Sequence, residues 1–215
     1  MVYFYESKPT EYSTPYQIVM GKDKFENDLL IKWSYRELNY VWFHADKYSS
    51  GHVYLKLRPN EKTIDDIPQE VICDCLQLCK SESIQGNKMP QCTILITPWH
   101  NLRKNRYMNP GEVSFKSLRQ CRKMECGARD NKILNRLAKT RVGLFNNVEA
   151  TLNEAKKTKN GDFFVNYIES NRSNLIEEEK LRKVAKKKPK RRRTNSLKMR
   201  LLTICNWKYD IIYIT

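Results

Sequence analysis

The stretch VWFHADKYSSGHVYLKL, from Val41 to Leu57, constrains the fold most because it contains two strand-forming runs with a turn between them. Val41–Phe43 consists of residues that favour β-strands. Tyr48–Gly51 supplies the turn, since its glycine accepts backbone angles that other residues disfavour. The apolar residues then alternate from Val53 to Leu57, which places them on one face of a second strand. The stretch therefore predicts two short strands that pair across a turn.

Two of the chain's three histidines, His44 and His52, flank this turn. Polar side chains at the rim of a sheet are a common setting for sites. Histidine titrates near neutrality and is a frequent metal ligand, so the pair suggests a ligand set, a general base or a base-stacking surface. No nucleophile or carboxylate pair stands beside them at a diagnostic spacing, so we expect binding rather than catalysis and no enzyme activity.

The remaining periodicity predicts an α+β fold, with a mixed or antiparallel sheet packed by two or three helices and a basic, helical C-terminal extension. Further strands are expected at Val2–Tyr5, Tyr16–Met20, Cys92–Thr97, Glu112–Phe115 and, at a sheet edge, Arg119–Cys126. Helices are expected at Phe25–Trp33, Val71–Cys79, Asp130–Phe145, Val148–Lys159 and Phe163–Ala185. Asp23 and Asp66 are expected to cap the first two helices. Gly143 is an awkward residue inside the third helix.

These elements predict three segments of different character. Residues 1–145 are long enough to bury a core and form the expected domain. Residues 146–185 form a helical extension without a sustained heptad. Residues 186–215 combine a basic run with an apolar tail of no visible partner, and we expect them to be poorly ordered.

The net charge of +16 is unevenly distributed. Leu181–Arg200 contains 11 basic residues and no acid, while Arg103–Arg141 contains 12 basic residues and three acids. Such asymmetry favours a polyanionic partner, although a solvated charged surface explains the second stretch equally well.

The run near the C-terminus is the densest cluster of charge. It has the form of a nuclear-import signal or of a tail that binds any polyanion. Its basic residues are Lys187, Lys188, Lys190, Arg191, Arg192 and Arg193. Because like charges repel and little apolar surface is available, residues 181–200 are expected to be mobile or loosely helical.

The sequence also predicts several absences. The N-terminus lacks the pattern of a signal peptide, and no stretch reaches transmembrane length. We therefore expect a cytoplasmic protein that also enters the nucleus, with its seven cysteines reduced. Cys73, Cys75 and Cys79 suggest a metal site with Cys121 and Cys126, but no compact Cys-x-x-Cys pair exists. Accordingly, no metal and no cofactor are expected.

Six short motifs carry a family resemblance because they recur in order at compatible spacing. They are Gly21–Asp28, Trp42–Ala45, Ser50–Val53, Ser83–Gly86, Thr97–Trp99 and Pro110–Val113. Over about residues 1–145 the chain resembles the NFACT-R domain, and more closely the coiled-coil domain-containing protein 25 family. The resemblance implies an α+β domain that binds RNA and has no catalytic residue. Relatives of the domain occur in proteins of ribosome-associated quality control.

One surface is expected to hold the RNA, with basic residues on phosphates and an aromatic ring on a base. The candidate residues are Lys22, His44, His52, Trp99, Arg103, Lys104, Arg106 and Tyr107. Trp99 or Tyr107 would stack the base. The expected partner is RNA, in a ribosome or as tRNA, with DNA as an alternative. A protein-interaction adaptor acting through the C-terminal helices is the other function, and the oligomeric state stays open.

Overall fold

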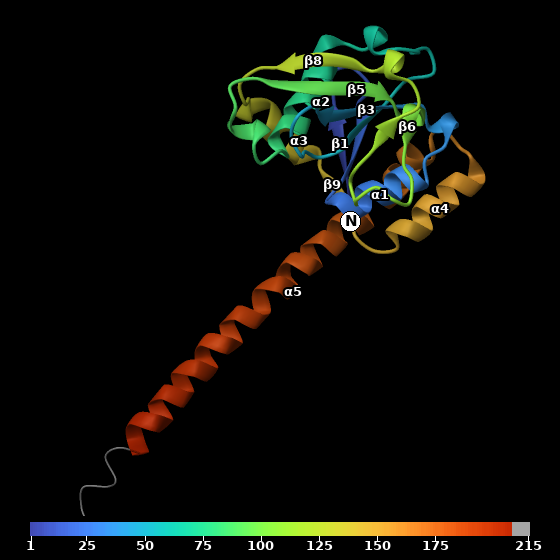
Figure 1. Ribbon diagram of the computed structural model, residues 1–215. Helices are drawn as coiled ribbons and strands as arrows, with labels where there is room; N and C mark the ends of the chain where they lie inside the picture. The colour runs from blue at the N-terminus through green and yellow to red at the C-terminus, as the bar shows by residue number, and fades with distance from the viewer. Residues whose placement is uncertain (208–215) are drawn as a thin grey trace, which may run out of the picture. The chain divides into compact units, whose positions relative to one another are not determined.

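The computed structural model describes the backbone of residues 1–207 and the side chains of residues 1–185 (Figure 1). In this part of the chain, seven strands form one sheet in the order β8-β5-β3-β4-β2-β1-β9, and every neighbouring pair is antiparallel. The strands are β1 (Val2–Ser7), β2 (Tyr16–Gly21), β3 (Tyr40–Ala45), β4 (Val53–Lys56), β5 (Cys92–Pro98), β8 (Arg122–Cys126) and β9 (Val142–Leu144). The α+β class and the edge position of β8 are thus confirmed.

The predicted strand pair lies in the middle of this sheet. β3 pairs with β4 so that Val41 faces Leu55 and Phe43 faces Val53. All four side chains are buried in one hydrophobic core, because strand residues two apart share a face. The residues between them, Trp42 and Tyr54, belong to a second core on the opposite face. The central strands are therefore apolar on both sides.

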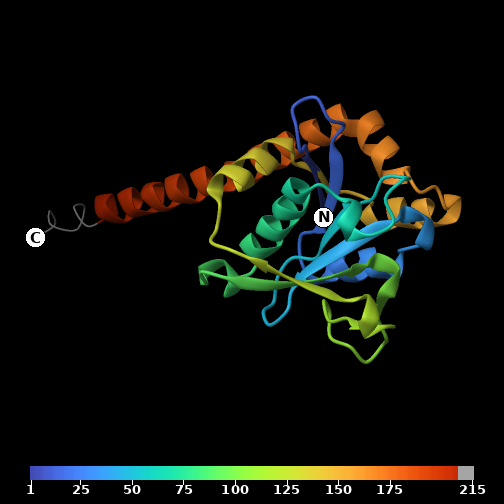
Figure 2. The same ribbon diagram turned by 90° about the horizontal axis from the view of Figure 1, so that it is seen from above.

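Helices cover both faces of the sheet (Figures 1 and 2). On one face lie α2 (Gln69–Ser81) and α3 (Asn131–Thr140), whose apolar residues join the first core. On the other face lie α1 (Lys24–Lys32), α4 (Val148–Thr158) and the beginning of α5 (Phe163–Trp207). The expected packing of the central strands between the first two helices is confirmed.

Two details of the helix prediction were wrong. The segment from Asp130 to Phe145 is not one helix, because α3 ends at Thr140 and β9 then pairs with β1. Gly143 is a poor helix former, and the edge of β1 offers hydrogen bonds that the extended backbone can use. Asp66 does not cap α2, whose N-cap residue is Pro68. It instead forms a capping box with Thr63 at the start of a short 3-10 helix, Ile64–Asp66.

The chain divides into two compact units, Met1–Leu175 and Ile176–Thr215. The first unit extends past the expected boundary at 145, since Phe164, Ile168 and Leu175 of α5 are buried in its second core. The second unit contains the rest of α5, whose backbone is helical through the basic run to Trp207. Mobility of residues 181–200 stays a prediction, and the end of the apolar tail lies outside the described residues.

Within the described ranges, no helix is both long and apolar enough to cross a lipid bilayer.

Candidate nucleic-acid interface

An aromatic cluster lies at the ends of β3 and β4, on the face that carries the second core. The His44 ring stacks on Trp42 with 5.3 Å between ring centroids and an interplanar angle of 6°. His52 meets His44 edge to face at 4.9 Å, and Phe115 packs on Trp42 at 5.8 Å. Trp99 packs against Tyr54 at 4.4 Å. The sequence brings these rings together because residues two apart on a strand point the same way.

The two histidines have different exposure. His52 is only 1% exposed, and burial, with a further contribution from His44, lowers its pKa to about 3. His44 is half-buried; burial lowers its pKa, while the carbonyl of Ala45, 2.8 Å from Nδ1, opposes the shift. Both rings are therefore neutral at pH 7 and contribute no positive charge to a ligand.

Trp99 is also buried, at 4% exposure, so neither its ring nor that of His52 offers a face to a ligand. This corrects the expectation that Trp99 stacks a base. Its indole N–H, like that of Trp42, has no hydrogen-bond acceptor among the described residues. Trp99 instead belongs to the second core, where it packs edge-on against Tyr40 with 5.2 Å between ring centroids.

The loop between β6 (Leu102–Arg103) and β7 (Ser114–Phe115) is fastened to α1 by one carboxylate. Asp28 Oδ1 accepts hydrogen bonds from Lys104 Nζ at 2.7 Å and from the Gly111 backbone N–H at 3.0 Å. Lys104 Nζ also donates to the carbonyls of Asn109 and Glu112, at 2.7 and 3.0 Å. Gly111 adopts φ +85°, a conformation that favours glycine. Lys104 therefore organises this loop, and its charge is already partnered.

Three of the predicted residues remain exposed on or beside this loop. Arg103 and Arg106 are exposed, and Tyr107 is 81% exposed. The Arg106 guanidinium lies 4.8 Å from the centre of the Tyr107 ring and donates to its hydroxyl. Arg103 makes no side-chain ion pair with another described residue. These three side chains have the positive charge and aromatic surface that single-stranded nucleic acids bind.

Lys22 lies exposed just before α1. The N-terminus of this helix is closed by Asp23, whose side chain accepts from the N–H groups of Phe25 and Glu26 at 2.9 and 3.4 Å. The expected cap is thus confirmed, and these N–H groups are not free for a phosphate. Lys22 can contribute only through its own charge.

Sequence reasoning missed a basic cleft beside the aromatic cluster. Its volume is about 460 Å³. It is lined by Ser34, Tyr35, Arg36, His100, Asn101, Leu102, Lys116, Ser117 and Gln120. Three of these carry or can carry positive charge, and no carboxylate lines the cleft. The only sequence signal for this cleft was the excess of basic residues after position 103. Arg36 and His100 lie outside that stretch, so the sequence did not connect them with it.

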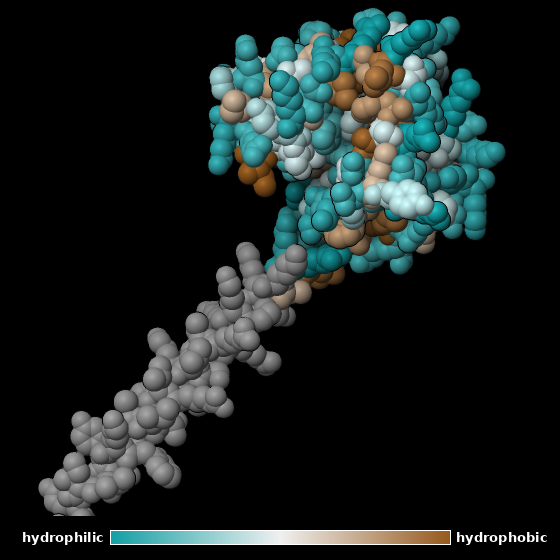
Figure 3. Space-filling view, in the orientation of Figure 1, coloured by the Kyte–Doolittle hydropathy of each residue, from teal (hydrophilic) through white to brown (hydrophobic). Residues whose placement is uncertain are grey.

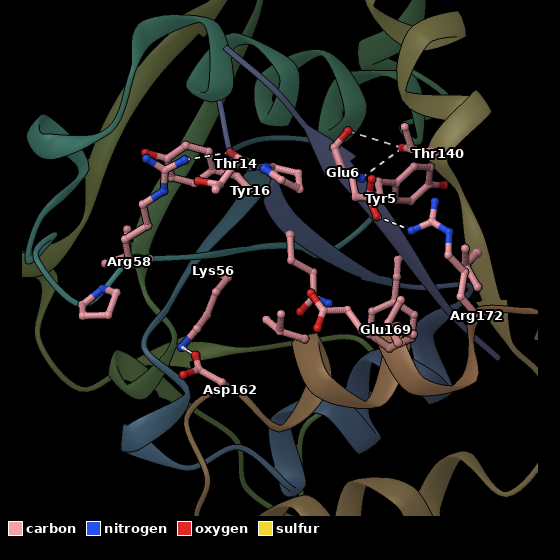
Figure 4. Close-up of a pocket in the computed structure, with 18 of the residues that line it drawn as sticks. Tyr5, Glu6, Thr14, Tyr16, Lys56, Arg58, Thr140, Asp162, Glu169 and Arg172 are labelled. Carbon is pink, nitrogen blue, oxygen red and sulfur yellow. Dashed lines mark hydrogen bonds and ion pairs between the residues drawn. The ribbon is translucent and has the colours of Figure 1, made fainter. Parts of the chain in front are cut away.

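A second cavity of about 420 Å³ lies between the strand ends and the first turns of α5 (Figure 4). Its wall carries Lys56 paired with Asp162 at 3.3 Å and Arg172 paired with Glu6. Arg58 lies 3.9 Å from the Tyr16 ring and donates to the Thr14 carbonyl. The lining also contains Glu169, so its three carboxylates balance its three basic side chains, and this cavity offers no net positive charge to a polyanion.

The cysteines do not form a metal site in the part of the chain whose side chains are described, where no group of three metal-ligating residues occurs. Cys75 and Cys79 are fully buried on α2, and burial raises the pKa of both thiols. These two residues act as small hydrophobes in the first core.

A family of known proteins matches the first half of this chain. The model of a family described as "NFACT protein RNA binding domain" matches residues 1–117. The chain belongs to this NFACT-R family. The matched segment contains β3, β4, the aromatic cluster and the whole β6–β7 loop. An RNA-binding domain is therefore established at the level of the family.

The curated relatives align with most of this NFACT-R chain. "Protein JLP2" of Saccharomyces cerevisiae is 96% identical over 91% of this chain and 94% of its own length. Coiled-coil domain-containing protein 25 of Bos taurus is 45% identical over 70% of each chain. A solved structure, the C-terminal part of the fibronectin/fibrinogen-binding protein from Streptococcus suis, has 18% identity and a TM-score of 0.48. That match covers 65% of this chain and 48% of the other.

Proposed function

We propose that the chain binds single-stranded RNA on the loop surface, defined here as Arg103, Arg106 and Tyr107 with Lys22 and His44 at its border. The observation that supports this most is the exposed Arg106–Tyr107 pair within the segment that matches an RNA-binding family. The face in Figure 3 is mainly hydrophilic, with smaller hydrophobic groups between the polar side chains, as a polar partner requires.

The residues of this surface would have different roles, set by the chemistry of their side chains. Arg103 and Arg106 would meet phosphates, because guanidinium groups match phosphate geometry. Tyr107 would stack a base on the ring face that Arg106 leaves open. Lys104, His52 and Trp99 would act as positioning residues, since the first holds the loop and the other two are buried.

A salt series separates these roles. In the full chain, Arg103→Gln/Arg106→Gln is expected to weaken binding to an unstructured RNA and to flatten its salt dependence by about 0.7 log unit per log unit of salt for each lost phosphate contact. Tyr107→Ala is expected to cost roughly 1–3 kcal/mol with an unchanged slope, because a stacking contact releases no counterion. Fluorescence anisotropy from low to high salt measures both quantities.

The matched control is Lys132→Gln/Lys139→Gln, which removes two exposed charges from α3 on the opposite face of the sheet. The basic run stays in every variant, so its contribution is constant. If the loop variants and the α3 variants change affinity and slope equally, the loop surface has no special role and the C-terminal run carries the binding.

We place this activity in a ribosome-associated, cytoplasmic setting, with a nuclear fraction through Lys187–Arg193 and with DNA as a competing ligand. Crosslinking in cells followed by sequencing of the attached nucleic acid tests the partner. Recovery of ribosomal RNA or tRNA in the wild type, reduced by the loop variants, is expected. Recovery of DNA alone would favour the DNA-binding alternative.

A second candidate is an adaptor function of α5. Leu181 and Val184 are 64% and 52% exposed on this helix, which gives a partner helix an apolar contact. Replacing both by glutamine is expected to remove protein partners from a pull-down without changing RNA affinity. Loss of RNA affinity alone would argue against the adaptor.

A further inference from the structure

The basic cleft is held together by one buried side chain. Asn101, which is 1% exposed, donates from Nδ2 to Thr97 Oγ1 at 2.8 Å and to the Ser117 carbonyl at 2.9 Å. Its Oδ1 accepts from the Ser117 N–H at 2.9 Å, and its carbonyl accepts from the Lys116 N–H at 2.9 Å. The 3-10 helix Trp99–Asn101 and the segment after β7 are thus fixed side by side. His100 and Lys116 are carried on these two segments.

The charges of the cleft are not balanced. Among the described residues, Arg36 forms no ion pair and no side-chain hydrogen bond, and Lys116 Nζ donates only to the His100 carbonyl, at 2.6 Å. Burial lowers the pKa of His100, and the charges of Arg36 and Lys116 lower it further. Arg36 and Lys116 therefore both lie close enough to His100 to disfavour its protonation, and a bound anion would offset this effect.

The donors of the cleft suit a particular anion. A phosphate monoester carries a charge of about −1.5 to −2 at pH 7 and presents three strong acceptor oxygens. Arg36 and Lys116 supply two permanent positive charges, and the Gln120 side chain has no partner among the described residues. A phosphodiester within a strand carries one negative charge and leaves part of this positive charge unbalanced.

We propose that this cleft binds a phosphate monoester, supplied by the terminal phosphate of a nucleic acid or by a free nucleotide. Arg36 and Lys116 bind the phosphate oxygens, and His100 adds a third donor once it is protonated. If the phosphate belongs to the end of a nucleic acid, this inference rests on the proposed function; if it belongs to a free nucleotide, it does not. The volume of about 460 Å³ accommodates the phosphate together with its attached sugar.

The test compares one RNA sequence with a 5′-phosphate, a 3′-phosphate or hydroxyl groups at both ends, using the full chain. One phosphorylated form is expected to bind roughly tenfold more tightly than the hydroxyl form, as charge-assisted contacts allow. Arg36→Gln/Lys116→Gln is expected to remove this preference. Lys132→Gln/Lys139→Gln, with the same loss of charge, is expected to retain it.

A second readout follows the His100 ring by NMR while adenosine 5′-monophosphate or inorganic phosphate is added. The bound dianion is expected to raise the pKa of His100, a shift that a purely structural role would not produce. A shift without an end preference in RNA identifies a free nucleotide as the source. Equal binding of all three RNAs together with an unmoved His100 titration overturns the proposal and leaves RNA binding intact. If no RNA binds, the proposed function fails, and the His100 titration alone decides for or against the cleft.

Discussion

Acidification from pH 7 to pH 4 is expected to remove on the order of 3 kcal/mol of folding stability through His52 alone. The pKa of this buried ring falls from 6.5 to about 3 in the folded protein. Between pH 6.5 and about pH 3, the unfolded chain therefore binds a proton at His52 that the folded chain does not bind. The contribution is complete above pH 6.5 and is lost as the pH falls toward 3. Urea unfolding at a series of pH values measures it.

The comparison needs variants because carboxylates titrate in the same range. His52→Gln removes the titrating group and is expected to show a shallower loss of stability below pH 6.5 than the wild type. His100→Gln removes a histidine whose pKa is also lowered but which lies exposed at the surface, so it is expected to change the curve less than His52→Gln does. Parallel curves for the wild type and His52→Gln would show that His52 is not the buried neutral group described above.

Trp42→Ala is expected to destabilise the domain by about 3–5 kcal/mol, the usual cost of removing a large buried ring. Trp42 is 1% exposed in the centre of the sheet and contacts His44, His52 and Phe115. Its indole N–H has no partner among the described residues, so the loss would come from packing and the cavity. Urea denaturation should show a lower midpoint with an unchanged slope.

Tyr107→Ala is the matched control, because it removes an aromatic ring that is 81% exposed. Its effect on stability is expected to stay within about 0.5 kcal/mol. The two variants should therefore separate folding from binding. A change below 1 kcal/mol for Trp42→Ala would mean that the aromatic cluster repacks easily and does not define the sheet.

Local patterns predicted much of the fold because alternation and capping are encoded by neighbouring residues. The β3–β4 pair, the Asp23 cap and α2 follow from such signals. β9 could not be predicted in this way, because its pairing with β1 joins residues more than a hundred positions apart. Helical spacing of apolar residues also continues through Val142, and only the partner strand decides between the two structures.

The sequence predicted which residues belong to the loop surface, but not which of their side chains are exposed. The sequence identified the basic loop and its aromatics, and Arg103, Arg106 and Tyr107 are indeed exposed. It could not show that Trp99 is buried or that Lys104 is partnered by Asp28, since both depend on distant packing. The cleft of Arg36, His100 and Lys116 was missed for the same reason, because its residues come from three separate segments.

The place of β9 beside β1 has a consequence for how the protein is made. A nascent chain grows from its N-terminus, so β1 is synthesised long before its neighbour β9 and before the buried residues of α5. Until then, Val2 and Phe4 lie on an uncovered apolar strand edge, which is the kind of surface that aggregates or recruits chaperones. Completion of the domain is therefore tied to late synthesis, and a ribosome that stalls before Leu175 would leave this sheet open.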